Sequence, residues 1–121
     1  TIIEEAFNIL KIEHLRSKFT SDLSDGERQL VSIAKALAQD TSTILLDEPT
    51  AFLDYSNKLL LHTTLKRIAK DTNKCIVLSS HDLDLSLETE CPFISVNPKS
   101  MKLEFIEAPT NKRDLIEIAF N

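Results

Sequence analysis

Two adjacent carboxylates, Asp47 and Glu48, follow a short apolar run at residues 43–46. If that run is a buried strand of an open α/β sheet, its carboxyl end lies at the crevice where such sheets bind ligands. Two neighbouring acids repel each other there unless a cation or a substrate compensates their charge. Asp47 then suits a Mg²⁺ ion held through water, and Glu48 suits a base that orients or deprotonates an attacking water. An isolated acid pair is more often a solvated loop, but the apolar run before it and Pro49-Thr50 after it favour the functional interpretation.

A second candidate site begins at Ser24. Ser24 and Glu27 have the spacing of a capping box, in which the serine side chain and the glutamate side chain each accept a hydrogen bond from the other residue's backbone. This structural role is sufficient by itself. Gly26, the only glycine of the chain, also brings backbone amides within close range of a phosphate at the helix start. The charges of Asp25 and Glu27 oppose such an anion, and Glu27 is alternatively long enough to reach a ribose hydroxyl.

His81 follows a second apolar run at residues 75–78. A lone histidine at such a place is more often a loop residue than a catalytic one. If the two runs are neighbouring parallel strands, His81 shares the crevice of Asp47 and is able to hydrogen-bond a terminal phosphate and sense its loss. By chemistry alone, Asp54 is expected to be a helix N-cap. The other two histidines are expected at the surface: His14 and His62.

Hydrophobic periodicity predicts the elements that position these residues. Strand, helix and strand follow one another around the acid pair, so the two strands should be parallel. From their apolar character they should be buried on both faces in a parent sheet that N-terminal strands complete. This chain alone should then have an open sheet edge and an uncovered apolar face. The predicted order is a helix at 3–10, a polar connection at 11–22, a helix from 24 to 39–40, a strand at 43–47, a helix at 56–70, a strand at 75–78, a helix at 82–88, strands at 93–96 and 102–106, and a helix at 112–120.

The composition limits the kinds of function that this chain can have. A chain of 121 residues is one domain or a piece of one, and it carries a net charge of −5 with scattered basic residues, which argues against nucleic acid as a partner. Cys75 and Cys91 lack metal-type spacing and are expected to be reduced thiols. The chain begins without methionine, so its true N-terminus is expected to be absent. A phosphate loop of the type G-x-x-x-x-G-K-[ST] needs two glycines, and this chain has one.

Together these residues resemble the C-terminal portion of an ABC transporter nucleotide-binding domain. The motifs stand in the family's order: a signature at residues 23–27, a Walker B segment at 44–48, a D-loop at 51–54 and a switch histidine at His81. The resemblance implies an α/β, P-loop NTPase-like fold over residues 1–121: a partial parallel sheet with flanking helices, then a β-hairpin and a helix, without the Walker A half. The segment 46–54 is similar to importers of iron-siderophore, haem or cobalamin type.

The resemblance also implies a mechanism. Two such domains form a head-to-tail dimer, expected to be a homodimer, with ATP and Mg²⁺ between them. Asp47 would serve the metal, and Glu48 and His81 would act in catalysis on the chain's own nucleotide. The remaining family residues would bind nucleotide at the interface: Ser24 and Gly26 at the γ-phosphate of the other subunit, Glu27 at the ribose, and Asp54 across the dimer contact. Permease subunits in the membrane, and indirectly an extracytoplasmic solute-binding protein, would be partners of this cytoplasmic, peripheral subunit.

The chain departs from the family pattern at the signature, which is usually Leu-Ser-Gly-Gly-Gln, because Asp25 and Glu27 stand at a glycine and at the glutamine. Since the phosphate loop is missing, the chain alone is expected to hold neither ATP nor Mg²⁺ and to be inactive. Two alternatives remain beside an importer subunit. One is a soluble ABC ATPase of translation or DNA repair, and the other is a non-catalytic fragment that only associates.

Overall fold

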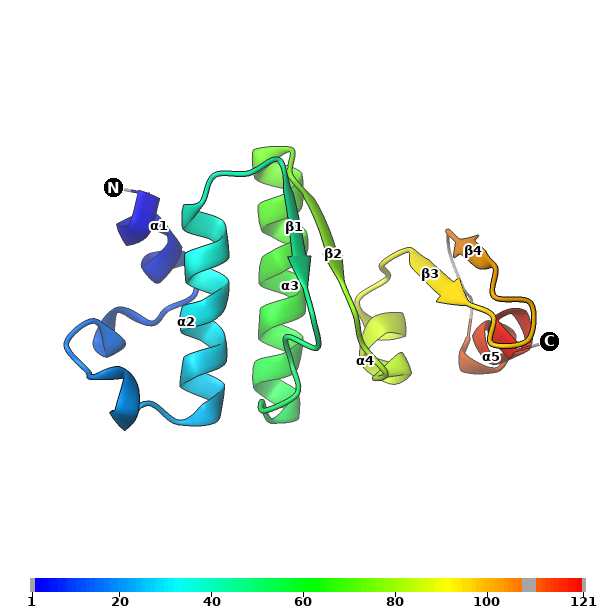
Figure 1. The fold of residues 1–121 in the computed structure, drawn as a ribbon, viewed down its shortest axis with the longest axis horizontal. Coiled ribbons are helices and arrows are strands. Elements are labelled where there is room, and N and C mark those ends of the chain that lie inside the picture. Colours follow the sequence, from blue (N-terminus) through cyan, green and yellow to red (C-terminus); the bar gives the residue numbers. More distant parts are fainter. Residues whose placement is uncertain (1, 108–110, 121) are drawn as a thin grey trace. The chain divides into compact units, whose positions relative to one another are not determined.

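The computed structural model describes residues 2–107 and 111–120, and it divides into two compact units, Thr1–His81 and Asp82–Asn121 (Figure 1). The first unit contains α1 (Ile2–Ile9), η1 (Glu13–Leu15), η2 (Thr20–Asp22), α2 (Asp25–Ala38), β1 (Thr43–Leu46), α3 (Tyr55–Thr72) and β2 (Cys75–Leu78). The second unit contains α4 (Leu83–Glu88), β3 (Phe93–Val96), β4 (Leu103–Ile106) and α5 (Lys112–Phe120). The predicted order of elements is confirmed, with two 3-10 turns inside the polar connection.

The strands of the first unit pair in parallel. Their register runs from Thr43 opposite Cys75 to Leu46 opposite Leu78. The 18-residue helix α3 forms the crossover between them, so the predicted βαβ unit is confirmed. β1 ends at Leu46, one residue before the predicted end, and Asp47 therefore lies in the loop after the strand.

The core of the first unit lies between its helices and one face of the strands. The amphipathic stripes of α2 and α3 both point inward, and Ile44 of β1 is buried against them. Two residues of the connection after α1, Ile12 and Leu15, complete this core. The main buried side chains of the two helices are Ile33, Ala34, Leu37, Leu61, Leu65 and Ile68.

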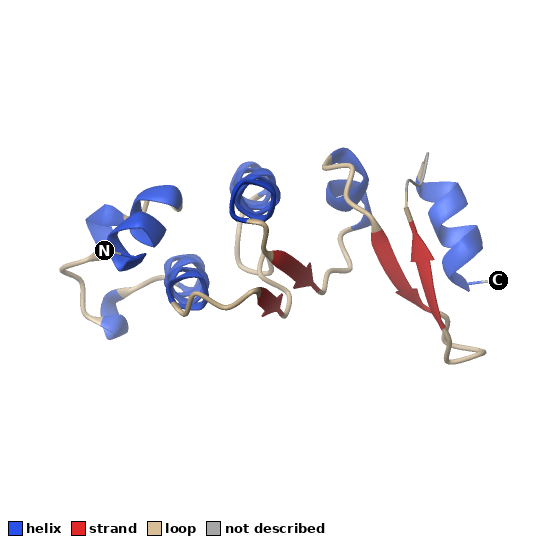
Figure 2. Ribbon diagram, turned by 90° about the horizontal axis from the view of Figure 1, so that it is seen from above, coloured by secondary structure: helices blue, strands red, loops and turns tan. Residues whose placement is uncertain are grey.

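The uncovered apolar face expected of this chain alone is present on the described strands, which are buried on one face and exposed on the other. Side chains alternate along a strand, and the register places Leu45 and Val77 together on the second face. Their exposed fractions are 75% and 41%, because no described element of this unit covers that face (Figure 2).

Of the two histidines predicted at the surface, one is exposed and the other is buried. His14 is exposed as predicted, whereas His62 is 4% exposed, so its predicted place at the surface is wrong. The inward stripe of α3 is wider than the apolar residues alone indicate, because it also includes His62 and Thr64 beside Leu61 and Leu65.

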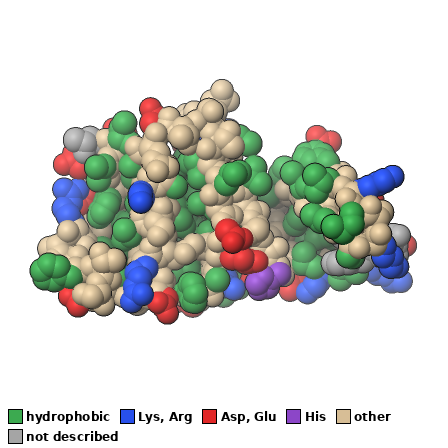
Figure 3. All heavy atoms as spheres, in the orientation of Figure 1, with side chains coloured by type: hydrophobic (Ala, Val, Ile, Leu, Met, Phe, Trp, Pro, Cys, Tyr) green, Lys and Arg blue, Asp and Glu red, His purple; other side chains and the backbone are tan. Residues whose placement is uncertain are grey.

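The second unit is an antiparallel hairpin with a helix on either side of it in sequence. Leu85, Ile106 and Leu115 are buried, and Lys112 Nζ donates to Asp84 Oδ2 at 2.9 Å. The opposite face of the hairpin is apolar and exposed through two cross-strand pairs: Ile94 with Phe105 and Val96 with Leu103. Hydrophobic side chains reach the surface in both units (Figure 3). None of the helices described here has the length and apolarity of a membrane span.

Candidate functional site

The parallel pairing brings the predicted acids and histidine to one edge of the first unit. β1 and β2 run in the same direction, and their carboxyl ends lie where α2 and α3 begin, at the lower end of this unit in Figure 1. Asp47 and Glu48 follow β1 directly, and Ser79 and His81 follow β2. This is the geometry of the ligand crevice at the strand ends of α/β sheets.

Three short hydrogen bonds connect these residues. Ser79 Oγ donates to Asp47 Oδ1 at 2.6 Å and accepts from the Glu48 backbone amide at 2.9 Å. His81 Nδ1 lies 2.6 Å from Glu48 Oε1. The His81 side chain is 88% exposed and that of Glu48 33% exposed, so the histidine is reachable from solvent while it contacts the acid. A carboxylate held in this way is oriented to accept a hydrogen bond from a water molecule that attacks a substrate.

The backbone of Glu48 is unusual. Its φ of 44° lies in the left-handed region, which non-glycine residues rarely occupy. Residues in such conformations cost about 1–3 kcal/mol and persist only where the surroundings impose them. Here the next two residues, Pro49 and Thr50, are almost completely buried and anchor the turn. The turn therefore fixes the direction in which the Glu48 side chain leaves the strand end.

The predicted capping box at the start of α2 is confirmed. The Glu27 amide donates to Ser24 Oγ at 3.2 Å, and the Ser24 amide donates to Glu27 Oε2 at 2.9 Å. Lys18 Nζ donates to the other carboxylate oxygen at 2.9 Å. The Lys18 hydrogen bond, followed by that of the Ser24 amide, lowers the pKa of Glu27 below its ordinary value. Both oxygens of Glu27 are thus engaged within the chain, and a ribose contact would have to replace one of these bonds.

Gly26 lies against the segment that follows the acid pair. A Cβ at this position would lie 3.2 Å from Leu53 Cδ2 and 3.3 Å from the Phe52 carbonyl oxygen. The close approach gives Gly26 a packing role. Among the described residues, the amides of Asp25 and Gly26 form no hydrogen bond, as is usual in the first turn of a helix, and they remain available to an anion.

Asp54 caps the next helix at the same edge. Its Oδ1 accepts from the Asn57 amide at 2.9 Å, and its Oδ2 accepts from Asn57 Nδ2 at 3.1 Å. The predicted N-cap is confirmed. The starts of α2 and α3 and the ends of both strands therefore present all seven predicted site residues at one edge: Ser24, Gly26, Glu27, Asp47, Glu48, Asp54 and His81.

The acids at this edge suit a magnesium ion only together with a nucleotide. Within residues 2–107 and 111–120, no group of three or more His, Cys, Asp or Glu side chains could hold a metal ion. Magnesium in nucleotide sites binds through one or two carboxylates together with water and phosphate oxygens rather than a protein cage. Asp47 has one oxygen bonded to Ser79 and a second oxygen available, so it fits a Mg²⁺ that arrives with a nucleotide.

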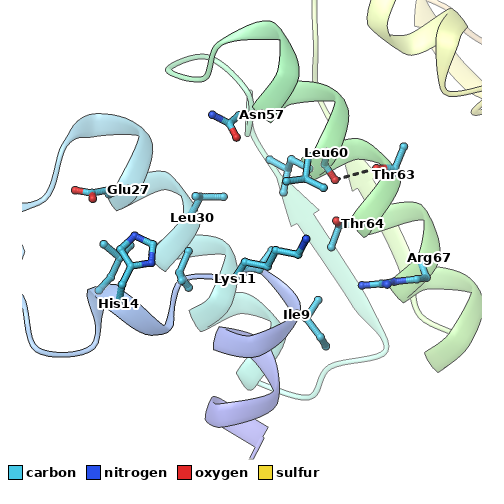
Figure 4. Close-up of a pocket in the computed structure, with 14 residues that line it drawn as sticks. Ile9, Lys11, His14, Glu27, Leu30, Asn57, Leu60, Thr63, Thr64 and Arg67 are labelled. Atoms are coloured by element: carbon cyan, nitrogen blue, oxygen red, sulfur yellow. Dashed lines mark hydrogen bonds between the residues drawn. The ribbon is translucent and has the colours of Figure 1, made fainter.

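A cavity of about 420 Å³ lies elsewhere in the first unit, between α1, α2 and α3 (Figure 4). Leu10 and Leu61 contribute to its apolar lining, and Lys11 and Arg67 extend toward each other within it. Of the predicted site residues, only Glu27 lines this cavity. The acid pair and His81 thus form an open surface at the strand ends and are not part of this pocket.

Ser79 is the residue that sequence reasoning missed. In the sequence it only follows the second apolar run, at residues 75–78, and no motif singles it out. The register contains the missing signal, because Leu46 lies opposite Leu78 and the next residues along the two strands are Asp47 and Ser79. A hydroxyl one residue beyond the strand end was therefore placed opposite the first acid.

The chain was compared with known proteins. A family model described as ABC transporter matches residues 1–51. A Bacillus subtilis protein named as a probable siderophore transport system ATP-binding protein is 30% identical over 98% of this chain and 43% of its own length. The solved structure of an inward-facing ABC transporter assigned to the metal-chelate type superposes with a TM-score of 0.79 at 28% identity, covering 95% of this chain and 46% of that chain.

A second solved structure, a dimeric ATP-binding cassette bound to ADP and Pi, gives a TM-score of 0.65 at 30% identity. The match covers 72% of this chain and 38% of that chain. The chain spans 30%, 37% and 43% of the lengths of three curated relatives that it matches.

Proposed function

Because this chain belongs to the ABC transporter ATPase family, we propose that it is the C-terminal part of an ATP-binding, ATP-hydrolysing subunit of an importer. The observation that carries the proposal is the contact network at the ends of the two parallel strands. There Ser79 holds Asp47, and His81 contacts Glu48 at 2.6 Å. The acid and the histidine at neighbouring strand ends would supply the water-orienting part of the machinery for phosphoryl transfer to water.

Each residue has a distinct role in this proposal. Glu48 orients the attacking water, and His81, which contacts Glu48 and is open to solvent, hydrogen-bonds the terminal phosphate. Asp47 would hold Mg²⁺, and the bound metal would neutralise charge on the phosphates. The reaction depends on positioning and electrostatics, since phosphoryl transfer to water needs no covalent intermediate on the protein.

The starts of α2 and α3 would form the contact with a second subunit, which we propose to be another copy of the same protein. Ser24 and Gly26 would meet the γ-phosphate held by the partner, and Glu27 the ribose. Support comes from the available amides of the first turn of α2 and from the dimeric cassette with ADP and Pi that this chain resembles. Asp54, at the same edge, would cross the interface.

For the transported solute we propose an iron-siderophore complex or a similar chelate. The support is the name of the Bacillus subtilis relative and the metal-chelate transporter structure. The subunit would then work at the cytoplasmic face of the membrane with permease subunits and, indirectly, an extracytoplasmic solute-binding protein. Deletion of the gene should abolish uptake of radioactive ferric siderophore; undiminished uptake would remove this choice of solute.

The catalytic proposal is tested in the full-length protein by Glu48→Gln. Removal of the water-orienting carboxylate should lower kcat by about 100-fold or more, while MgATP binding changes little. The matched control is Glu5→Gln on α1, an equally small change at an exposed acid, which should hydrolyse ATP at the wild-type rate. Equal losses of kcat and of nucleotide affinity in Glu48→Gln would remove Glu48 from this role.

The same proposal predicts that the 121-residue chain alone binds MgATP weakly and does not hydrolyse it. Most nucleotide affinity in such ATPases comes from the backbone amides and the lysine of a phosphate loop, and the single glycine excludes that motif here. Micromolar binding in a calorimetric titration would contradict this expectation.

A further inference from the structure

Ser79 occupies a position between the two acids of the candidate site. It follows the last residue of β2, and its hydroxyl reaches across to the end of β1. A serine hydroxyl has one donor and two acceptor positions. Here the donor is used on Asp47 Oδ1 at 2.6 Å, and one acceptor position is used by the Glu48 amide at 2.9 Å. One side chain therefore contacts both acids, the first through its carboxylate and the second through its backbone.

We propose that Ser79 is a positioning residue for hydrolysis, which fixes Asp47 and Glu48 relative to each other through its hydroxyl. The inference rests on the proposed function of the acid pair. It adds a residue that lies outside the four motifs and that the spacing of those motifs does not single out.

The first acid is positioned directly. The bond from Ser79 restricts rotation of the Asp47 carboxylate and occupies Oδ1, which leaves Oδ2 for a cation. A short hydrogen bond to a charged acceptor is stronger than one between neutral groups. The orientation of the Asp47 carboxylate is thus set by a residue of the chain itself.

The second acid is positioned through its backbone. Glu48 has a φ of 44°, a conformation that needs support from its surroundings. Its amide follows the strand and would otherwise lack a partner in the β1–β2 ladder, which ends with Ser79 N donating to the Leu46 carbonyl at 2.9 Å. The Ser79 hydroxyl accepts from this amide, and His81 contacts the Glu48 carboxylate from the same segment. The two ends of Glu48 are therefore held by residues 79 and 81.

Two substitutions separate the hydroxyl from the bulk of the side chain. Ser79→Thr keeps the hydroxyl and Ser79→Val replaces it with a methyl group in an otherwise similar β-branched side chain, which suits an extended segment. A merely structural role for side-chain volume would affect both variants alike. A role for the hydroxyl affects only Ser79→Val.

The first measurement is hydrogen exchange of the Glu48 amide by NMR in the 121-residue chain. Exchange should be about 10-fold faster in Ser79→Val than in the wild type and unchanged in Ser79→Thr. Equal exchange in all three proteins would overturn the proposal that Ser79 holds this amide. This measurement does not depend on ATP hydrolysis.

The second measurement is steady-state ATP hydrolysis by the full-length protein. Ser79→Val should lower kcat about 10-fold, a difference of about 1.4 kcal/mol in activation free energy, with KM for MgATP changed less than 2-fold and Ser79→Thr close to the wild type. An unchanged kcat in Ser79→Val would refute a role in hydrolysis. If the wild-type protein hydrolyses no ATP, the proposed function fails, and the exchange measurement still decides whether Ser79 fixes the acid pair.

Discussion

Ser24 is expected to act both as a helix cap and as a phosphate contact, and two substitutions can separate these roles. Ser24→Ala removes the side-chain acceptor for the Glu27 amide, a bond of 3.2 Å. It leaves the second half of the capping box, because Glu27 accepts from the Ser24 backbone amide at 2.9 Å. Loss of one cap bond costs about 1 kcal/mol, which for a chain of this size corresponds to a fall in Tm of about 4 °C. Ser32→Ala, at an exposed position inside α2, is the matched control and should not destabilise the helix.

Ser24→Asp keeps a cap acceptor and adds a negative charge. The Tm and the amide exchange rates of α2 should stay close to those of the wild type, since an acidic side chain is favourable at the N-terminus of a helix. If Ser24 meets the γ-phosphate of a partner, the added charge next to Asp25 and Glu27 repels that phosphate. ATP-driven dimerisation of the full-length protein in sizing chromatography should then be lost. Wild-type dimerisation of Ser24→Asp would reduce Ser24 to a helix cap.

Two further predictions follow from charge and exposure. The pKa of Glu27 is lowered, so its charged form contributes stability above the ordinary carboxyl pKa of 4.5. This contribution is lost as the pH falls through the lower pKa of the folded state. In urea titrations, Glu27→Gln should therefore be less stable than the wild type at pH 7 and equally stable at low pH, and a difference that persists in acid would contradict the argument. The isolated chain should self-associate through its open apolar faces, because Leu45 is 75% exposed and Leu103 is 72% exposed. The double substitution Leu45→Thr and Val77→Thr should weaken this association in light scattering. A stable wild-type monomer at high concentration, with no surface that binds a hydrophobic dye, would show that these faces do not drive association.

Much of the local structure was determined by the sequence. The Ser24 and Asp54 caps depend on bonds three residues apart, and helical spacing from Leu30 to Leu37 defines the inward face of α2. The boundaries of the second strand and of the last helix agree with the pattern, at 75–78 and 112–120. These features could be predicted because each arises from neighbours along the chain.

The candidate site could be predicted from the sequence only in part, and the rest depended on the tertiary structure. Adjacent acids after an apolar run, and a histidine after the next run, indicated the crevice at the strand ends. The contact of 2.6 Å between His81 and Glu48 joins residues 33 positions apart and follows from the parallel register. Only the tertiary structure gave Ser79 its partners and placed Glu48 in the left-handed region, because neither property is encoded in local spacing.

Burial was likewise decided by packing. The sequence of β1 is apolar throughout from Ile44 to Leu46, yet Ile44 is 4% exposed and Leu45 is 75% exposed. His62 is polar and nevertheless buried, since its position on α3 turns it toward the core. An amino-acid pattern determines which residues favour burial and in which element they lie. Which face another element covers is determined by the arrangement of the helices on the sheet, and the described helices of the first unit cover one face of β1 and β2.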